Sequence, residues 1–188
     1  MSETVVVIGN FDGVHPGHVE VLAEAHARRP DLPLVVVTFW PHPISVLRPA
    51  LGPMLLTGLD QRIELLQQAG ADRVEVIHFT PEFATHTPAE FVDEVLLPLH
   101  PALIVVGENF RFGHRAAGNV QTLRELGQGR FEVEGLRLVR FGDEETCSTV
   151  IRASPRHAAD HHVAVADRLD LFDAVLRRQG IEARKHRV

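Results

Sequence analysis

Short apolar runs rich in β-branched residues alternate along the chain with stretches in which apolar residues recur at helical spacing. The apolar runs, which are typical of buried strands, are residues 5–8, 34–39, 74–79 and 103–106, with shorter strand-like pieces within 131–141 broken at Gly135. The helical stretches are residues 19–29, 60–69, 87–96 and 119–126. Because most of these runs are nearly continuous in apolar residues, this rhythm predicts a doubly wound α/β domain with a five-stranded parallel sheet covered on both faces.

Helix-boundary signals support these ranges. Thr87 before Pro88 and Asn119 before the fourth stretch are good N-cap residues, and Gly70 ends the second stretch as a helix end should. Ligands of such sheets bind beyond the carboxyl ends of the strands. We therefore expect chemistry in the segments that directly follow the apolar runs.

The glycine-rich segment 9–18, G-N-F-D-G-V-H-P-G-H, joins the first predicted strand to the first predicted helix. Its glycines permit a sharp turn and a close approach of the backbone to a ligand, and Pro16 suits the first turn of a helix. The free N–H groups of that helix would favour a phosphate, which His15 and His18 could both face. The segment has neither G-x-G-x-x-G nor the Lys-Ser/Thr ending of a P-loop, and the alternative is a tight turn with two exposed histidines.

Composition and charge narrow the range of partners. The chain has 188 residues, about one ordinary domain, with 45% hydrophobic residues and a net charge of −6. No basic block occurs, so we expect no nucleic-acid partner, whereas small anionic substrates need only a local positive potential. The single cysteine, Cys147, excludes an internal disulfide and suits a reducing cytoplasm. With no window long enough to cross a membrane and no secretory pattern, we expect a cytoplasmic protein without membrane contact.

Two further loops follow strands. In residues 38–43, two prolines flank His42 and predict a stiff, extended loop beside Phe39 and Trp40. This segment is either an aromatic wall for a flat heterocycle or a turn over the core. In residues 107–118, glycines punctuate a loop that carries Asn109 and Arg111, whose side chains offer hydrogen bonds to a nucleotide or stay solvated.

A fourth segment lies near the carboxyl end of this region. Ser148 and Thr149 are good N-cap residues, so a helix that begins there would be a second anion site. Arg152 lies one turn inside that helix and can reach a phosphate.

These strings together resemble the adenylyltransferase module of bacterial bifunctional FAD synthetases, a branch of the nucleotidylyltransferases. The matching strings are G-N-F-D-G-V-H-P-G-H at 9–18, T-F-W-P-H-P at 38–43, V-G-E-N-F-R-F-G at 106–113 and S-T-V-I-R at 148–152. The resemblance covers roughly residues 4–152. It departs at Trp40, which is polar in some members, at Cys147, where a serine-type residue is usual, and at Val150, where an arginine is common.

The resemblance implies a Rossmann-like nucleotidylyltransferase fold and the transfer of AMP from ATP to FMN, giving FAD and pyrophosphate. It gives catalytic roles to His15 and His18 at the α-phosphate and to Arg152 at the leaving pyrophosphate. The nucleotide or flavin contacts that it implies are Gly9, Asn10, Phe11, Asp12, Gly17, Phe39, Pro41, His42, Pro43, Gly107, Asn109, Arg111, Ser148 and Thr149. Mg²⁺ is expected to enter with ATP, bridging phosphate oxygens, without a metal site made of protein ligands.

The resemblance also predicts the domain organisation. Residues 1–153 form the adenylyltransferase-like domain, and 154–188 form a C-terminal helical tail with an amphipathic run at 163–176. The bifunctional family continues into a riboflavin kinase barrel, for which the tail is too short, so we expect no kinase module here and a separate riboflavin kinase in the pathway.

Three other interpretations stay open. A nucleotidylyltransferase with another phosphorylated acceptor, such as a phosphopantetheine, would keep H-x-G-H without needing T-F-x-P-H-P. A non-catalytic flavin- or nucleotide-binding protein would bind without releasing pyrophosphate. A truncated gene product would be inactive.

Overall fold

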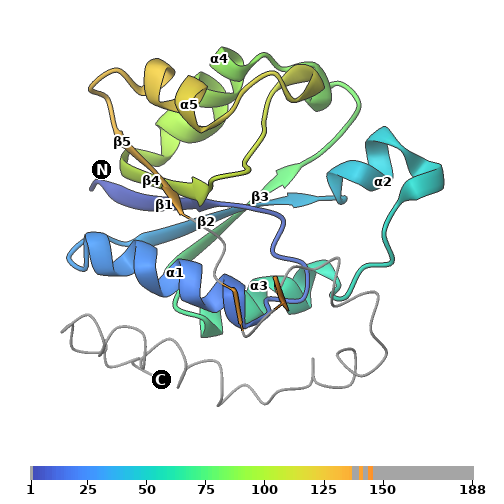
Figure 1. Cartoon of the computed structure of the whole chain (residues 1–188), viewed down its shortest axis with the longest axis horizontal. Helices are drawn as coiled ribbons and strands as arrows, with labels where there is room; N and C mark the ends of the chain where they lie inside the picture. Colours follow the sequence, from blue (N-terminus) through green and yellow to red (C-terminus); the bar gives the residue numbers. More distant parts are fainter. Residues whose placement is uncertain (1, 137–139, 142–143, 146–188) are drawn as a thin grey trace.

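Five parallel strands form one sheet in the order β3-β2-β1-β4-β5 (Figure 1) in the computed structural model, which describes residues 2–136, 140–141 and 144–145. The strands are β1 (Thr4–Ile8), β2 (Leu34–Trp40), β3 (Arg73–His78), β4 (Pro101–Gly107) and β5 (Glu132–Leu136). Two short strands, β6 (Arg140–Phe141) and β7 (Glu144–Glu145), pair antiparallel after β5. The predicted doubly wound, five-stranded parallel sheet is confirmed.

Helices cover both faces of the sheet: α1 and α3 lie on one face and α4 and α5 on the other, while α2 stands apart beyond the end of β2 (Figure 1). The helices are α1 (Pro16–Arg28), α2 (Pro43–Leu47), α3 (Leu59–Gln68), α4 (Pro88–Phe91) and α5 (Val120–Gly127). A π turn (Val92–Leu96) and a 3-10 turn (Leu97–Leu99) continue α4. Further 3-10 turns are Pro49–Leu51, Phe83–Thr85 and His114–Ala116.

The central strand β1 is buried along its whole length because it contributes to two cores. Successive side chains of a strand point to opposite faces. Val5 and Val7 join the core that includes Leu22 and Leu66, whereas Val6 and Ile8 join the core beneath α4 and α5. This explains why the sequence of β1 is a continuous apolar run and does not alternate between apolar and polar residues.

The N-caps predicted at Thr87 and Asn119 both form. The Thr87 hydroxyl accepts a hydrogen bond from the Glu90 backbone N–H at 3.3 Å, and the Glu90 carboxylate accepts one from the Thr87 N–H at 2.7 Å, which completes a capping box. Asn119 Oδ1 accepts from the Thr122 N–H at 3.0 Å at the start of α5. These caps fix the start of both helices that cover the second face of the sheet.

Two local expectations differ from the structure. Residues 38–43 are not an extended loop: β2 continues to Trp40, and α2 begins at Pro43, because His42 Nδ1 accepts a hydrogen bond from the Ile44 N–H at 3.2 Å and caps it. β5 does not break at Gly135, since this residue pairs with Val106 inside the strand. The predicted helical tail lies outside the described residues.

Within the described ranges, no helix is both long enough and apolar enough to cross a membrane.

Candidate active site

The loop between β1 and α1 (residues 9–15, the β1–α1 loop) has an unusual backbone. Phe11, Gly13 and Val14 have φ angles of 49°, 82° and 40°. Positive φ suits glycine, but for a β-branched valine it is rare and costs on the order of 1–3 kcal/mol. Such strain persists only where surrounding contacts determine the backbone, and it concentrates at ligand sites.

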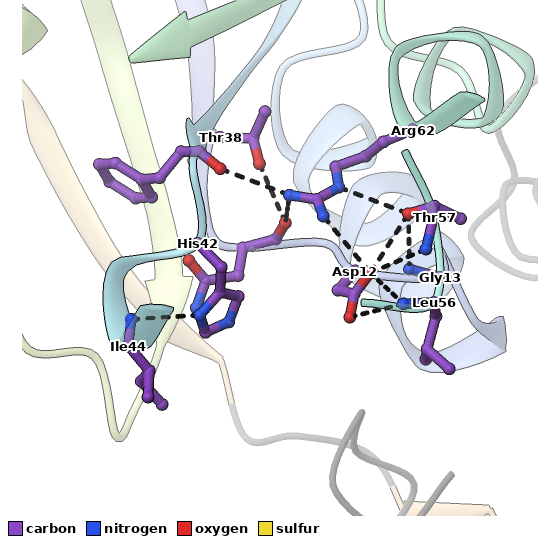
Figure 2. A network of polar contacts seen from close by, with 10 residues as sticks. Asp12, Gly13, Thr38, His42, Ile44, Leu56, Thr57 and Arg62 are labelled. Atoms are coloured by element: carbon purple, nitrogen blue, oxygen red, sulfur yellow. Dashed lines mark hydrogen bonds and ion pairs between the residues drawn. The ribbon is translucent and has the colours of Figure 1, made fainter. Parts of the chain in front are cut away.

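A buried polar network supplies those contacts (Figure 2). The Asp12 carboxylate accepts hydrogen bonds from the N–H groups of Leu56 and Thr57 at 3.0 and 3.1 Å. The Thr57 hydroxyl in turn accepts from the Gly13 N–H at 3.2 Å. Asp12 was expected among the ligand contacts, but its side chain is buried and directed into this network, where it holds the shape of the loop.

Arg62 of α3 is the centre of the network, and sequence reasoning missed it. Its side chain is fully buried, and Nη2 lies 3.3 Å from Asp12 Oδ1 while Nη1 donates to the Asn10 carbonyl at 3.0 Å. A sequence signal existed: Arg62 shares the helical spacing of Leu65, Leu66 and Ala69, which places it on the buried face of α3.

His15 and His18 form a stacked pair at the start of α1. Their ring centroids are 3.7 Å apart, and the edge of Phe11 approaches His18 at 5.1 Å between centroids. Burial, the adjacent His15 ring and the Arg62 guanidinium hold the pKa of His18 well below its ordinary value of 6.5. His18 is therefore neutral at physiological pH, and the alternative of two exposed histidines is wrong, since His15 is 3% exposed.

The N-terminus of α1 faces the same loop. His15 occupies the N-cap position, its side chain makes no capping hydrogen bond, and Pro16 follows as the first helical residue. The His18 and Val19 N–H groups donate to the His15 carbonyl at 2.8 and 3.3 Å. The helix dipole still favours an anion at this end of α1. The loop, the helix end and the histidine pair therefore offer one anion-binding surface.

A cleft of about 910 Å³ adjoins this surface at the carboxyl ends of β1 to β4. Gly9 and Asn10 belong to both the β1–α1 loop and the cleft wall. The wall is aromatic, and its phenylalanines are Phe39, Phe79, Phe83, Phe91, Phe110 and Phe112. Aromatic walls with a few polar groups are typical of sites for flat ligands.

The charges around the cleft are positive. Arg48, Arg111 and Arg115 line it, and no aspartate or glutamate is among the described residues of its wall. His86 also lines the cleft. Burial opposes its protonation, but the hydrogen bonds that its ring donates to the Glu94 carboxylate and to the Phe83 carbonyl outweigh burial and raise the pKa of His86. The cleft therefore favours a ligand that is both aromatic and anionic.

The structure brings only some of the sequence-predicted residues together. The expected contacts that line the cleft are Gly9, Asn10, Phe39, Pro43 and Arg111. Those that are not part of the cleft wall are Pro41, His42, Gly107 and Asn109. Of these, His42 is buried as the cap of α2, and Asn109 is exposed just after β4. Phe11 and Gly17 are buried beside the histidines, whereas Ser148, Thr149 and Arg152 lie outside the described residues.

No group of three or more histidine, cysteine, aspartate or glutamate side chains suited to a metal ion occurs in the part of the chain that the structure describes.

Comparison with known proteins identifies the family. The family model described as FAD synthetase matches residues 1–150. The chain belongs to the FAD synthetase family. As a member of it, the chain is 34% identical over 151 residues to the bifunctional riboflavin kinase/FMN adenylyltransferase of Listeria monocytogenes, a match that covers 79% of this chain and 48% of that protein. The Escherichia coli K12 protein of the same name is 31% identical over 169 residues, covering 88% of this chain and 53% of that protein.

The chain spans about half the length of the curated relatives that it matches. Among solved structures, a Streptococcus pneumoniae chain named as a macrolide-efflux protein matches with a TM-score of 0.71 and 30% identity, covering 81% of this chain and 52% of that one. Pantothenate synthetase from Thermus thermophilus matches with a TM-score of 0.52 and 18% identity over 94% and 77% of the two chains. The second likeness concerns the fold alone, and it agrees with the expected nucleotidylyltransferase fold.

Proposed function

We propose that the chain transfers AMP from ATP to FMN, giving FAD and pyrophosphate. The observation that carries this proposal is the junction of the anion-binding loop with the aromatic cleft at Gly9 and Asn10. A phosphate in the loop and a flat ring in the cleft would be neighbours, as the two substrates of this reaction must be. The relatives' name, FMN adenylyltransferase, supports the same activity.

The loop takes the α-phosphate of ATP in this proposal. His15 and His18 stack at 3.7 Å, so two positive charges there would repel each other, and the low pKa of His18 keeps its ring neutral before ATP arrives. A neutral imidazole still has one N–H to donate. Aimed at the α-phosphate together with the positive end of the α1 dipole, it stabilises charge that grows in the transition state.

The reaction itself needs no covalent enzyme intermediate. A phosphate oxygen of FMN attacks the α-phosphorus of ATP in line, and pyrophosphate leaves on the opposite side. Ser148, Thr149 and Arg152 are proposed to hold the leaving pyrophosphate. Mg²⁺ would enter with ATP and neutralise phosphate charge.

The cleft takes the flavin. An isoalloxazine ring is flat and apolar over most of its surface, which suits walls of phenylalanine. The FMN phosphate would lie toward the loop, and Arg111 is placed to attract it because it lines the cleft at an exposed position after β4.

The test is incubation of the chain with ATP, Mg²⁺ and FMN, followed by chromatography for FAD. A parallel incubation replaces FMN with 4′-phosphopantetheine. FAD above a no-enzyme control supports the proposal. Pyrophosphate release with phosphopantetheine alone would indicate another acceptor, and quenching of FMN fluorescence without pyrophosphate release would indicate a non-catalytic flavin-binding protein.

A further inference from the structure

We propose that Arg62 is a positioning residue for adenylyl transfer, which fixes the β1–α1 loop against the wall of the aromatic cleft. The inference rests on the proposed function, because it assigns the relative placement of the two substrates to one buried side chain. It concerns a residue that is not part of the cleft wall, although its charge also contributes to the lowered pKa of His18.

The contacts of the Arg62 guanidinium join segments that are distant in sequence (Figure 2). Nη1 donates to the Asn10 carbonyl at 3.0 Å and to the Phe39 carbonyl at 3.4 Å. The guanidinium carbon also lies 5.4 Å from the centre of the Trp40 ring. Arg62 on α3 thus holds the loop after β1 and the end of β2 at the same time.

The two carbonyl groups belong to the site. Asn10 and Phe39 both line the cleft, and Asn10 is also part of the β1–α1 loop. A second donor reaches the Asn10 carbonyl, since the Thr38 hydroxyl donates to it at 2.9 Å. The loop is therefore tied to β2 at the point where the two substrates would meet.

Stability alone is a poor reason for this arrangement. Arg62 and Asp12 are 0% and 1% exposed, and burying both charges costs much of what their attraction returns. Apolar residues of similar volume often stabilise a core as well or better. Only a fork of several donors, however, can hold the two carbonyl groups and the Asp12 carboxylate together.

The expected consequence is a loss of rate rather than of binding. In the proposed function the β1–α1 loop holds the α-phosphate of ATP and the cleft holds FMN, and Arg62 does not line the cleft. The rate depends on how the attacking oxygen and the α-phosphorus are aligned, and a misplacement of about 1 Å costs about 100-fold. Arg62 therefore acts on the step that needs both substrates.

The experiment compares Arg62→Met with Arg62→Lys and with a matched control, Arg28→Met. Arg28 pairs with Glu134 at 2.7 Å on the exposed surface, at the far end of α1. We expect Arg62→Met to bind FMN and a non-hydrolysable ATP analogue within about threefold of wild type, and to lose about 100-fold in single-turnover transfer. Arg62→Lys keeps the charge and part of the donors, so it should recover to within about tenfold, and Arg28→Met should match wild type.

A folded Arg62→Met that transfers AMP within about threefold of wild type would overturn the proposal. If this variant does not fold, the double variant Asp12→Asn/Arg62→Met serves instead, because the amide keeps an acceptor for Leu56 and Thr57 and removes the unpaired buried charge. We expect the double variant to fold and to remain slow. Recovery of the wild-type rate in it would show that Arg62 only neutralises Asp12.

A readout without turnover separates this inference from the proposed function. If wild type forms no FAD, the proposed function fails on its own. Backbone amide chemical shifts of residues 9–14 then test Arg62: large changes in Arg62→Met, absent in Arg28→Met, support the link between loop and cleft. If the amide shifts of this loop are unchanged in Arg62→Met, the inference about Arg62 is wrong, whichever reaction the chain catalyses.

Discussion

In the proposed reaction, the role of His18 follows from the side chains that surround its ring. The ring stacks on His15, meets the edge of Phe11, and keeps Nδ1 buried with no hydrogen-bond partner within the described residues. An imidazole in this setting stays neutral and is aimed by packing instead of by a hydrogen bond. Its replacement should therefore affect the reaction and not the fold.

His18→Ala should fold normally, bind FMN as wild type does, and lose about 10²–10³ in kcat, which is typical for the loss of one transition-state donor. The measurement is melting temperature, FMN affinity and turnover on the same preparation, with exposed His78→Ala as the control. Turnover near that of wild type, with a lowered melting temperature, would make His18 a packing residue only.

The low pKa of His18 also predicts how stability depends on pH. In the unfolded chain His18 takes up a proton near pH 6.5, whereas in the folded state it resists protonation. The free energy of unfolding should therefore fall as the pH drops below that value, by up to about 1.4 kcal/mol per pH unit. His86 has the opposite sign, because its raised pKa stabilises the fold at low pH and this contribution is lost as the pH rises through the raised value. Urea unfolding from about pH 7.5 to about pH 5.5 should therefore give a shallower decline for His18→Gln than for wild type. If the stability of wild type and of His18→Gln declined equally with pH, the lowered pKa of His18 would be contradicted.

At the scale of elements, the loop after β4 depends on a close contact with α4. Gly113 has a φ of +73°, and a Cβ built on it would lie 2.8 Å from the Pro88 ring. Gly129 has a similar φ of +76° but open space around it. The two glycines therefore separate backbone strain from steric contact.

Gly129→Ala should destabilise the fold by about 1 kcal/mol, which is a typical cost of a left-handed alanine. Gly113→Ala should cost about 3 kcal/mol or more, because strain and the collision with Pro88 add, and it should weaken FMN binding since Gly113 lines the cleft. Urea unfolding and flavin fluorescence measure the two effects. Equal destabilisation by both variants would show that the loop moves away from α4 without cost.

The elements that the sequence predicts are those with strong local signals. The apolar strands, the caps at Thr87 and Asn119, and the parallel sheet follow from residue patterns that depend little on distant contacts. Helix α2 has only five residues, too few for a helical period to show in the sequence, which is why it was missed. The Asp12–Arg62 pair was missed for another reason: a long-range contact between charged residues leaves no periodic pattern.

At the scale of the whole molecule, the site exists because a parallel sheet brings the carboxyl ends of β1, β2, β3 and β4 to one edge. Sequence order predicts that edge, and motifs predict which loops matter. Motifs do not give the distances between loops. Only the folded structure shows that Asn109 is not part of the cleft wall and that Phe79 and Phe83 are.

A ligand that spans cleft and loop should stabilise the whole domain. FMN at about 100 times its Kd adds about 2.7 kcal/mol, which for a chain of this length raises the melting temperature by about 5–10 °C. Inorganic phosphate at the same concentration reaches only the anion-binding surface and should raise it far less. Equal shifts from FMN and phosphate would mean that the aromatic cleft does not take the flavin ring.

The position of β1 in the sheet has a further consequence for the lifetime of the site. β1 lies between β2 and β4 and is buried throughout, whereas the edge strands β3 and β5 are mostly half-buried or exposed. Local unfolding begins where buried contacts are few and reaches the core only with global unfolding. Fluctuations that open either edge strand therefore leave the histidine pair anchored to the strand that opens last.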